Sequence, residues 1–248
     1  MENIRLDFPF FNQNTDTIYF DNAATTQKPS CVIDCINEYY SNYNANVHRG
    51  VYKIAEKATH EFELTRDLVA DFIGAKNRES IVFTSGATES INLVAHSWAK
   101  QNLSRGDHIL LTQMEHHSNI VPWHIIAEDL DLHIDFIPIT NNGELDLGSI
   151  DELITPKIKL VSIVHQSNVL GTINPIKTII DKAHKNGSIV LIDGAQSIAH
   201  QKINVEELDC DFFVFSGHKI YGPTGVGVLY GKTSLLEQMK PILGGGEM

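Results

Sequence analysis

Three short polar stretches in this sequence carry groups that could act together in chemistry. Ser85-Gly86-Ala87-Thr88 precedes a stretch with helical spacing, so its backbone N–H groups and the Thr88 hydroxyl could hold an anion at a helix N-terminus. Asp193 ends an apolar run, where an ionised carboxylate is unfavourable unless a cation or a hydrogen-bond donor lies near it. Lys219 follows another apolar run, and its amine must be neutral to attack a carbonyl.

Each of these groups also has a purely structural interpretation. The stretch ending at Thr88 could be a plain helix cap, and Asp193 could cap a helix that begins near Ala195. Lys219 could be a solvated charge at a strand end. At the reference pKa of ~10.4, only about one lysine in a few thousand is neutral at pH 7. A reactive Lys219 therefore requires desolvation or a covalent bond to its amine.

Seven short apolar runs indicate the strands that would position these groups. They are Ile81–Phe83, Ile109–Leu111, Ile134–Ile139, Leu160–Val164, Ile189–Ile192, Phe212–Phe215 and Val226–Tyr230. Stretches of helical length, 87–101, 119–130 and 174–187, separate most of them, which is typical of βα units in a mainly parallel α/β sheet. Only a turn separates the last two runs, so Val226–Tyr230 is predicted to be antiparallel to its neighbours.

The N-terminal part has a different pattern. Residues 1–16 are mixed polar and aromatic, and they predict an arm that is ordered only where it docks. A brief strand is expected at Thr17–Phe20, followed by helices over 29–43 and 53–73, the second ending at Gly74. Residues 17–248 are then expected to form one large domain.

Polar residues follow five of the predicted strands. In mainly parallel sheets, ligands bind beyond the carboxyl ends of the strands. The polar residues at these ends include Thr88, His116, Asn168, Asp193, Gln196, Ser216, His218 and Lys219. We therefore expect them to meet at one rim of the sheet.

An anion cradle, a carboxylate and a lysine on one rim match the requirements of pyridoxal 5′-phosphate. Its phosphate needs donors, its ring nitrogen needs a carboxylate and its aldehyde needs a lysine. His116 could cover the ring, and Gln196 could donate to its phenolate oxygen. A zinc site built from Glu115, His116 and His117 is an alternative, but adjacent histidines point in different directions on regular structure, which disfavours it.

Composition limits the partners and the location. The formal net charge is −12 and the basic residues are scattered, which argues against nucleic acid as a partner. No apolar run is long enough to cross a membrane and no leader segment is recognisable, so the sequence predicts a cytoplasmic protein. The three cysteines, Cys31, Cys35 and Cys210, lack the spacing of a zinc site or a disulfide scaffold.

Ordered motifs over nearly the whole chain identify a family resemblance. The motifs are Tyr19–Pro29 (YFDNAATTQKP), Asn46–Gly50 with Ala58-Thr59, Phe83–Asn92 (FTSGATESIN), Met114–Trp123 (MEHHSNIVPW), His165–Thr172 (HQSNVLGT), Val190–Gln196 (VLIDGAQ) and Phe215–Gly225 (FSGHKIYGPTG). The chain resembles the class V aminotransferase group of fold type I pyridoxal-phosphate enzymes, and within it cysteine desulfurases of the SufS and CsdA type. The resemblance implies an aspartate-aminotransferase-like large domain.

The resemblance also implies roles for individual residues. Lys219 would bond the cofactor and later move protons, Asp193 would pair with the pyridine nitrogen, and Gln196 would contact the phenolate oxygen. His116 would stack on the ring, with an acid–base role. The phosphate would be held by Ala87, Thr88, Ser216 and His218, and the substrate would face Asn168, His48 and Arg49.

The activity implied is removal of sulfur from L-cysteine, leaving L-alanine and an enzyme persulfide for transfer to an acceptor protein in iron–sulfur cluster assembly. A selenocysteine lyase, another enzyme of the group, and an inactive fragment are the alternatives. Relatives of this type are homodimers. The final residues, Gly244–Met248, resemble a mid-chain motif, so the small C-terminal domain, with the persulfide cysteine and the carboxylate-binding arginine, is expected to be absent from these 248 residues.

Overall fold

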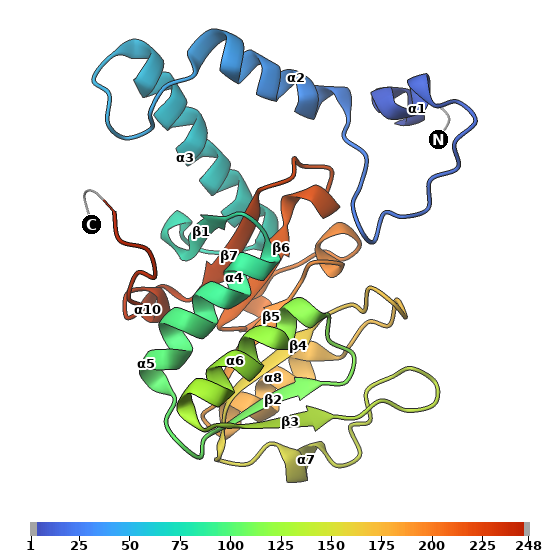
Figure 1. The fold of residues 1–248 in the computed structure, drawn as a ribbon, viewed down its shortest axis with the longest axis vertical. Coiled ribbons are helices and arrows are strands. Elements are labelled where there is room, and N and C mark those ends of the chain that lie inside the picture. Colours follow the sequence, from blue (N-terminus) through green and yellow to red (C-terminus); the bar gives the residue numbers. More distant parts are fainter. Residues whose placement is uncertain (1–3, 246–248) are drawn as a thin grey trace.

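Seven strands form one sheet at the centre of the molecule (Figure 1). A computed structural model of the chain describes residues 4–245. The strands are β1 (Ile81–Thr84), β2 (His108–Thr112), β3 (His133–Ile137), β4 (Ile158–Val164), β5 (Ile189–Asp193), β6 (Phe212–Ser216) and β7 (Gly227–Gly231). Their order across the sheet is β1-β7-β6-β5-β4-β2-β3. The seven predicted strands are therefore confirmed.

Strand direction brings the predicted site together. β7 is antiparallel to both of its neighbours, β6 and β1, and every other pairing is parallel. All strands except β7 consequently run in one direction, and their carboxyl ends lie at the same edge. This confirms the predicted mainly parallel α/β sheet and the reversed final strand.

Helices flank the sheet on both faces. The helices of residues 4–245 are α1 (Pro9–Gln13), α2 (Ser30–Glu38), α3 (Lys53–Ile73), α4 (Ala87–Leu93), α5 (Lys100–Asn102), α6 (Val121–Leu130), α7 (Ile150–Leu153), α8 (Ile176–Lys185), α9 (Val205–Leu208) and α10 (Thr233–Leu236). Figure 1 shows α4, α5 and α6 over one face, with α8 on the other. The predicted helix over 53–73 is confirmed as α3, which ends at Gly74 with φ of 69°, a backbone conformation that glycine adopts without strain. None of the helices in residues 4–245 combines the length and the apolar character needed to cross a membrane.

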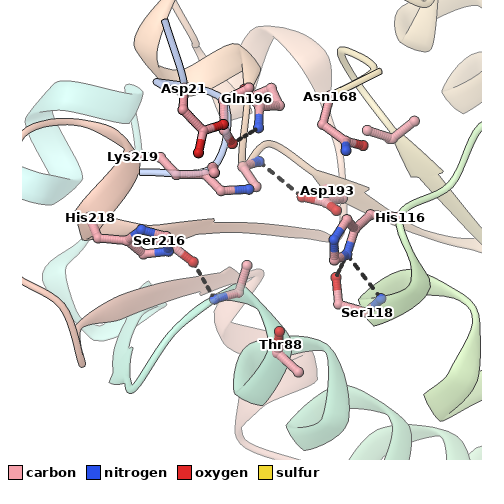
Figure 2. A pocket seen from close by; sticks show the side chains of 15 residues that line it. Asp21, Thr88, His116, Ser118, Asn168, Asp193, Gln196, Ser216, His218 and Lys219 are labelled. Carbon is pink, nitrogen blue, oxygen red and sulfur yellow. Dashed lines mark hydrogen bonds between the residues drawn. The ribbon is translucent and has the colours of Figure 1, made fainter. Parts of the chain in front are cut away.

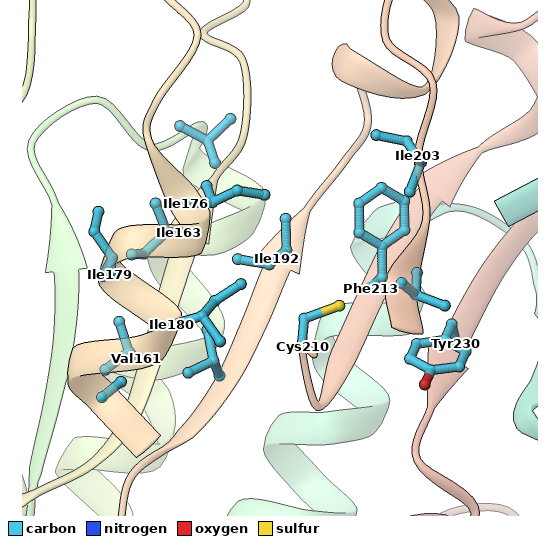
Figure 3. Close-up of a cluster of buried hydrophobic side chains, with 14 of the residues drawn as sticks. Val161, Ile163, Ile176, Ile179, Ile180, Ile192, Ile203, Cys210, Phe213 and Tyr230 are labelled. Carbon is cyan, nitrogen blue, oxygen red and sulfur yellow. The ribbon is translucent and has the colours of Figure 1, made fainter. Parts of the chain in front are cut away.

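Successive side chains along each strand point to opposite faces of the sheet, so a separate hydrophobic core forms on each face. Leu160 and Leu191 face the helices of the α4–α6 side, whereas Val161 and Ile192 face α8. Figure 3 shows the second cluster, in which β4 and β5 side chains pack against Ile176, Ile179 and Ile180 of α8. Each fully buried side chain of this size contributes roughly 1.5–3 kcal/mol. The sheet is therefore a rigid platform for its carboxyl edge.

The segment before α3 contributes little to these cores. Helix α2 has no buried residue, and α2 and part of α3 extend away from the sheet (Figure 1). The strand predicted at Thr17–Phe20 is wrong, because these residues join no sheet and Phe20 is 92% exposed. The arm contacts the body through the Phe8 and Tyr221 rings, whose centroids lie 5.8 Å apart. Residues 1–3 of the arm and 246–248 of the final motif lie outside the described residues.

Candidate active site

A cavity of about 490 Å³ opens at the carboxyl edge of the sheet, within the range typical of small-molecule sites (Figure 2). Its lining consists of Asp21, Ala23, Ala24, Ala87, Thr88, His116, Ser118, Val164, Asn168, Asp193, Ala195, Gln196, Ser216, His218 and Lys219. The predicted rim is therefore one continuous cavity wall.

Nine of the predicted site residues line this cavity, and two do not. The nine are Ala87, Thr88, His116, Asn168, Asp193, Gln196, Ser216, His218 and Lys219. His48 and Arg49 lie in the turn before α3 and are not part of the lining. The His48 ring instead contacts Glu63, with its Nε2 3.1 Å from Oε1.

The start of α4, where the sequence predicts an anion cradle, faces the cavity through Ala87 and Thr88. Ser216, at the end of β6, accepts a hydrogen bond from the Ala87 N–H through its Oγ at 2.8 Å. Since this oxygen accepts from the backbone, the Ser216 hydroxyl proton remains to donate to a ligand. Gly227 of β7 packs against Gly86, and a Cβ on Gly227 would lie 2.3 Å from the Gly86 Cα. The cradle thus requires glycine at the adjacent strand.

Asp193 is the carboxylate at the floor of the cavity, and it is 2% exposed. Its Oδ1 accepts a hydrogen bond from the Ala195 N–H at 2.9 Å. Burial raises the pKa of Asp193, against the opposing effects of this hydrogen bond and of the Lys219 charge. A cationic partner in the cavity would stabilise the ionised form of this carboxylate.

Lys219 lies in the single 3-10 turn Gly217–Lys219 that follows β6. Burial lowers its pKa, and the Asp193 charge opposes that shift only in part. A lysine desolvated in this way is neutral more often than a surface lysine, as a nucleophilic amine requires.

His116 faces the cavity from the loop after β2. Its Nδ1 accepts the backbone N–H of Ser118 at 3.1 Å, and the Ser118 Oγ lies 2.8 Å from the same atom. An N–H can only donate, so Nδ1 carries no proton in this arrangement. Burial, followed by the Lys219 charge, lowers the pKa of His116. The neutral ring therefore carries its proton on Nε2.

Glu115, next to His116 in sequence, points into the protein. Its Oε1 accepts from the Thr112 hydroxyl at 2.6 Å and from the Val164 N–H at 2.9 Å, and its Oε2 accepts from Asn119 Nδ2 at 2.6 Å. Burial raises the pKa of Glu115 to about 8. Because Glu115 is directed into this network, it does not converge with His116 and His117 on a metal position.

Sequence reasoning did not assign the N-terminal segment to the site. Asp21, Ala23 and Ala24 line the cavity, and the Gln196 Nε2 donates to the Ala23 carbonyl at 2.7 Å. We call residues 19–28 the strap. The small residues at 21–24 were visible in the sequence, but Ala23 and Gln196 are 173 positions apart, and no local signal indicated that the two would meet.

The donor set fits pyridoxal 5′-phosphate. The cradle at α4 and the Ser216 hydroxyl offer donors to a phosphate, and the Asp193 carboxylate can pair with a protonated ring nitrogen. Lys219 supplies the amine from the same cavity wall.

A family model described as aminotransferase class-V matches residues 18–248. The chain belongs to the class-V aminotransferase family. This confirms the family part of the sequence resemblance.

Relatives in this family are similar over the whole chain. A probable cysteine desulfurase from Vibrio cholerae serotype O1 is 50% identical over 251 residues, covering 100% of this chain and 62% of that protein. One from Halalkalibacterium halodurans is 49% identical, covering 97% of this chain and 60% of that protein. The chain therefore spans about 60% of the length of these curated relatives.

Solved structures agree with the fold. The apo cysteine desulfurase from Thermococcus onnurineus NA1 superposes with a TM-score of 0.93 at 44% identity, covering 99% of this chain and 60% of that one. The cysteine desulfurase CsdA from Escherichia coli has a TM-score of 0.91 at 40% identity, covering 100% and 61%. The arrangement of the sheet is thus shared with cysteine desulfurases.

Proposed function

We propose that this chain provides the cofactor-binding part of a cysteine desulfurase that uses pyridoxal 5′-phosphate. The observation that carries the proposal is the single cavity that brings Lys219, Asp193 and the Ala87–Thr88 cradle together. The names of the similar proteins support the same reaction. When bound, the cofactor supplies an electron sink for bond changes at the α- and β-carbons of an amino acid.

The half-buried Lys219 and the buried Asp193 would hold the two ends of the ring. Lys219 would hold the cofactor aldehyde through its Nζ, and its lowered pKa favours the neutral amine that this bond requires. Asp193 would pair with the ring nitrogen, where its charge keeps that nitrogen protonated. The Gln196 amide is oriented by the Ala23 carbonyl, so it is held in place to contact the phenolate oxygen.

His116 would cover the ring and exchange a proton through Nε2. The two contacts from Ser118 occupy Nδ1, which leaves Nε2 as the atom that faces reacting groups. At the other end, Thr88, Ser216 and His218 would hold the phosphate together with the start of α4. Asn168 lines the same cavity and would face the substrate.

The substrate proposed is L-cysteine, converted to L-alanine with transfer of its sulfur to an enzyme cysteine and then to an acceptor protein, as in iron–sulfur cluster assembly. L-Selenocysteine is the second candidate substrate. None of Cys31, Cys35 and Cys210 lines the cavity, so the proposal assigns the persulfide to none of them.

A homodimer is part of the proposal, and the α2–α3 region supports it. Ile33 and Ile36 of α2 are 45% and 41% exposed, and Leu68 and Phe72 of α3 are 59% and 57% exposed. Large apolar side chains exposed on both helices favour surfaces that a partner covers. His48 and Arg49 lie in the same region, so the proposal that they face substrate requires a neighbouring subunit. A cytoplasmic location stays a prediction from the sequence.

The cofactor proposal is tested by spectroscopy. Adding pyridoxal 5′-phosphate to the purified chain should produce the visible absorbance of a lysine-bound cofactor, and borohydride should then attach the label at Lys219. Lys219→Ala should abolish both signals, whereas the matched variant Lys232→Ala should retain them. A wild-type chain that stays colourless would contradict the proposal.

The substrate proposal needs a separate measurement. Alanine release from L-cysteine and from L-selenocysteine should be compared under identical conditions with the loaded protein. Alanine from L-cysteine that disappears in Lys219→Ala would support the desulfurase reaction. Release from L-selenocysteine alone would favour the second candidate.

A further inference from the structure

The strap reaches the peptide that joins His218 to Lys219. The carbonyl oxygen of His218 accepts from the Thr26 N–H at 3.0 Å, the Thr26 hydroxyl at 2.9 Å and the Lys28 Nζ at 3.0 Å. The Thr25 hydroxyl approaches the same oxygen at 3.3 Å. A carbonyl oxygen has two lone pairs, so these donors together saturate it and restrict its direction.

Lys28 is an unusual donor for this position. Its Nζ also contacts the Thr26 carbonyl at 2.5 Å, and within residues 4–245 it forms no ion pair with a carboxylate. Burial lowers the pKa of Lys28. Its charge is thus directed at two backbone carbonyls, and hydrogen bonds from a charged donor are stronger than those between neutral groups.

A second hydrogen bond joins the strap to the backbone that follows Lys219. The Thr26 hydroxyl accepts the Tyr221 N–H at 2.9 Å, and Tyr221 has a φ of 70°, a conformation that side-chain-bearing residues rarely adopt. The backbone before and after Lys219 is therefore tied to Thr26 on both sides. Lys28 closes this arrangement by linking Thr26 to His218.

We propose that Lys28 is a positioning residue for Lys219, because its ammonium bridges the carbonyls of Thr26 and His218 and so fixes the turn Gly217–Lys219. This inference rests on the proposed role of Lys219 in holding the cofactor. Lys28 itself is not part of the cavity lining, so it acts through the turn.

The charge of Lys28 has a second effect at the same place. After burial, the charges of Lys219 and Lys28 lower the pKa of His218. The His218 Nδ1 lies 3.1 Å from the Thr25 Oγ1, within the strap. Lys28 therefore favours a neutral His218 ring. The titration of His218 thus reports the charge of Lys28 without any cofactor.

The test compares Lys28→Met, which keeps most of the length of the side chain but removes its charge, with Lys28→Arg, which keeps both charge and donors. The matched control is Lys159→Met, since the Lys159 Nζ also donates to a backbone carbonyl, that of Pro156, but on an exposed surface. Pyridoxal 5′-phosphate is added to cofactor-free protein, borohydride stops the reaction at timed intervals, and label at Lys219 is quantified by peptide mass spectrometry. Thermal unfolding shows that each variant is folded.

Misplacement of a reacting group by about 1 Å can slow a reaction as much as 100-fold, so Lys28→Met should capture cofactor at Lys219 about tenfold more slowly. Lys28→Arg should stay within about threefold of wild type. Lys159→Met should match wild type. A folded Lys28→Met that captures at the wild-type rate, even with a lower melting temperature, would overturn the inference, because a purely structural contact predicts that result.

Two measurements on cofactor-free protein separate this inference from the proposed function. The Tyr221 amide should exchange with solvent about tenfold faster in Lys28→Met than in wild type, since its partner Thr26 is less constrained. The His218 ring should titrate at a higher pH in Lys28→Met than in Lys28→Arg. If wild type captures no cofactor, the proposed function fails; if these two properties do not change in Lys28→Met, the positioning inference fails independently.

Discussion

Two buried aspartates lie at opposite ends of the adjacent strands β5 and β6, and each has a lysine near it. The two pairs differ in how completely the chain compensates their charges. Asp193, at the end of β5, is 2% exposed, and Asp211, just before β6, is 4% exposed. Asp211 has a complete set of partners within the chain. The His184 Nε2 lies 2.8 Å from it, the Lys232 Nζ lies 3.0 Å from it, and the Val190 N–H donates to it at 2.8 Å.

The lysines show the same difference. Although burial lowers the pKa of Lys232, its hydrogen bonds to Asp209 and Asp211 more than compensate and raise it. Burial lowers the pKa of Lys219, and the Asp193 charge offsets this only in part. Within residues 4–245, no salt bridge joins Lys219 to Asp193.

Burial of a carboxylate therefore does not by itself indicate a functional site. In the Asp211 cluster the carboxylate meets the Lys232 cation and the Val190 N–H, so the loss of one partner would leave a buried charge poorly compensated. At the carboxyl edge, Asp193 and Lys219 both face the cavity, and burial shifts the pKa of each toward its neutral form because neither has a full set of partners in the chain. A ligand with a cationic nitrogen could pair with Asp193, and its aldehyde could react with the Lys219 amine.

The largest change in stability is expected at the complete pair. Asp211→Asn should lower the free energy of unfolding by about 1.5–3 kcal/mol, since it removes the buried carboxylate that Lys232, His184 and the Val190 N–H share and leaves the two side chains only the more exposed Asp209. Urea unfolding at pH 7 measures this loss. A change below about 1 kcal/mol would mean that the Asp211 cluster is as weak as a surface ion pair.

Asp193→Asn should behave in the opposite way. Without cofactor, the free energy of unfolding should stay the same or rise, because the substitution removes a buried charge whose pKa burial already raises. Affinity for pyridoxal 5′-phosphate should fall by about 1.5–3 kcal/mol, the contribution of a hydrogen bond to a charged group. Absorbance titration measures the affinity, and unfolding without cofactor provides the control. Unchanged affinity would remove Asp193 from the proposed site.

Glu115 extends the comparison to a buried carboxyl that is hydrogen-bonded but unpaired. Its pKa is raised from 4.5 to about 8, so between these pH values the folded chain binds more protons at Glu115 than the unfolded chain does. Stability from this group is therefore complete below pH 4.5 and is lost as the pH rises to about 8.

Glu115→Gln should make the fall of stability with pH shallower by up to about 1.4 kcal/mol per pH unit. Urea unfolding at several pH values in this window measures the slope. The exposed variant Glu128→Gln changes the same charge and should leave the slope close to that of wild type. Equal slopes for wild type and Glu115→Gln would show that Glu115 is ionised throughout.

The smallest effects are expected at the two lysines. Lys232→Met should lower the free energy of unfolding by about 1 kcal/mol, a value reduced by solvent screening because the side chain is 32% exposed. Lys219→Met should leave it within about 0.5 kcal/mol of wild type, since a desolvated amine is replaced by an apolar chain of similar length. Parallel unfolding curves of the cofactor-free variants test this contrast. A larger loss for Lys219→Met would make Lys219 a structural charge.

Local patterns were sufficient to predict the strands and most helices. The apolar runs that became β4, β5 and β6 are short, bounded by turn residues and buried on both faces, so few other structures suit them. The prediction at Thr17–Phe20 was wrong because a strand must pair with the edge of a sheet. A four-residue pattern does not show whether such an edge lies near it.

The site could be predicted in part for a similar reason. Parallel strands place their carboxyl ends at one edge, so the polar residues after β1, β2, β4, β5 and β6 were expected together before their distances were known. The strap could not be predicted in this way. Thr26 and His218 are 192 residues apart, and nothing in either neighbourhood encodes the contact between them.

The sequence by itself determined which segments form strands, which polar residues follow each strand, and the family motifs. These features depend on residue type and local periodicity. Only the tertiary structure decided which aspartate and which lysine remain incompletely compensated. Asp193 with Lys219 and Asp211 with Lys232 have similar residue types and similar burial. Their partners come from distant parts of the chain, and the electrostatic environment of a buried charge is the sum of those distant contacts.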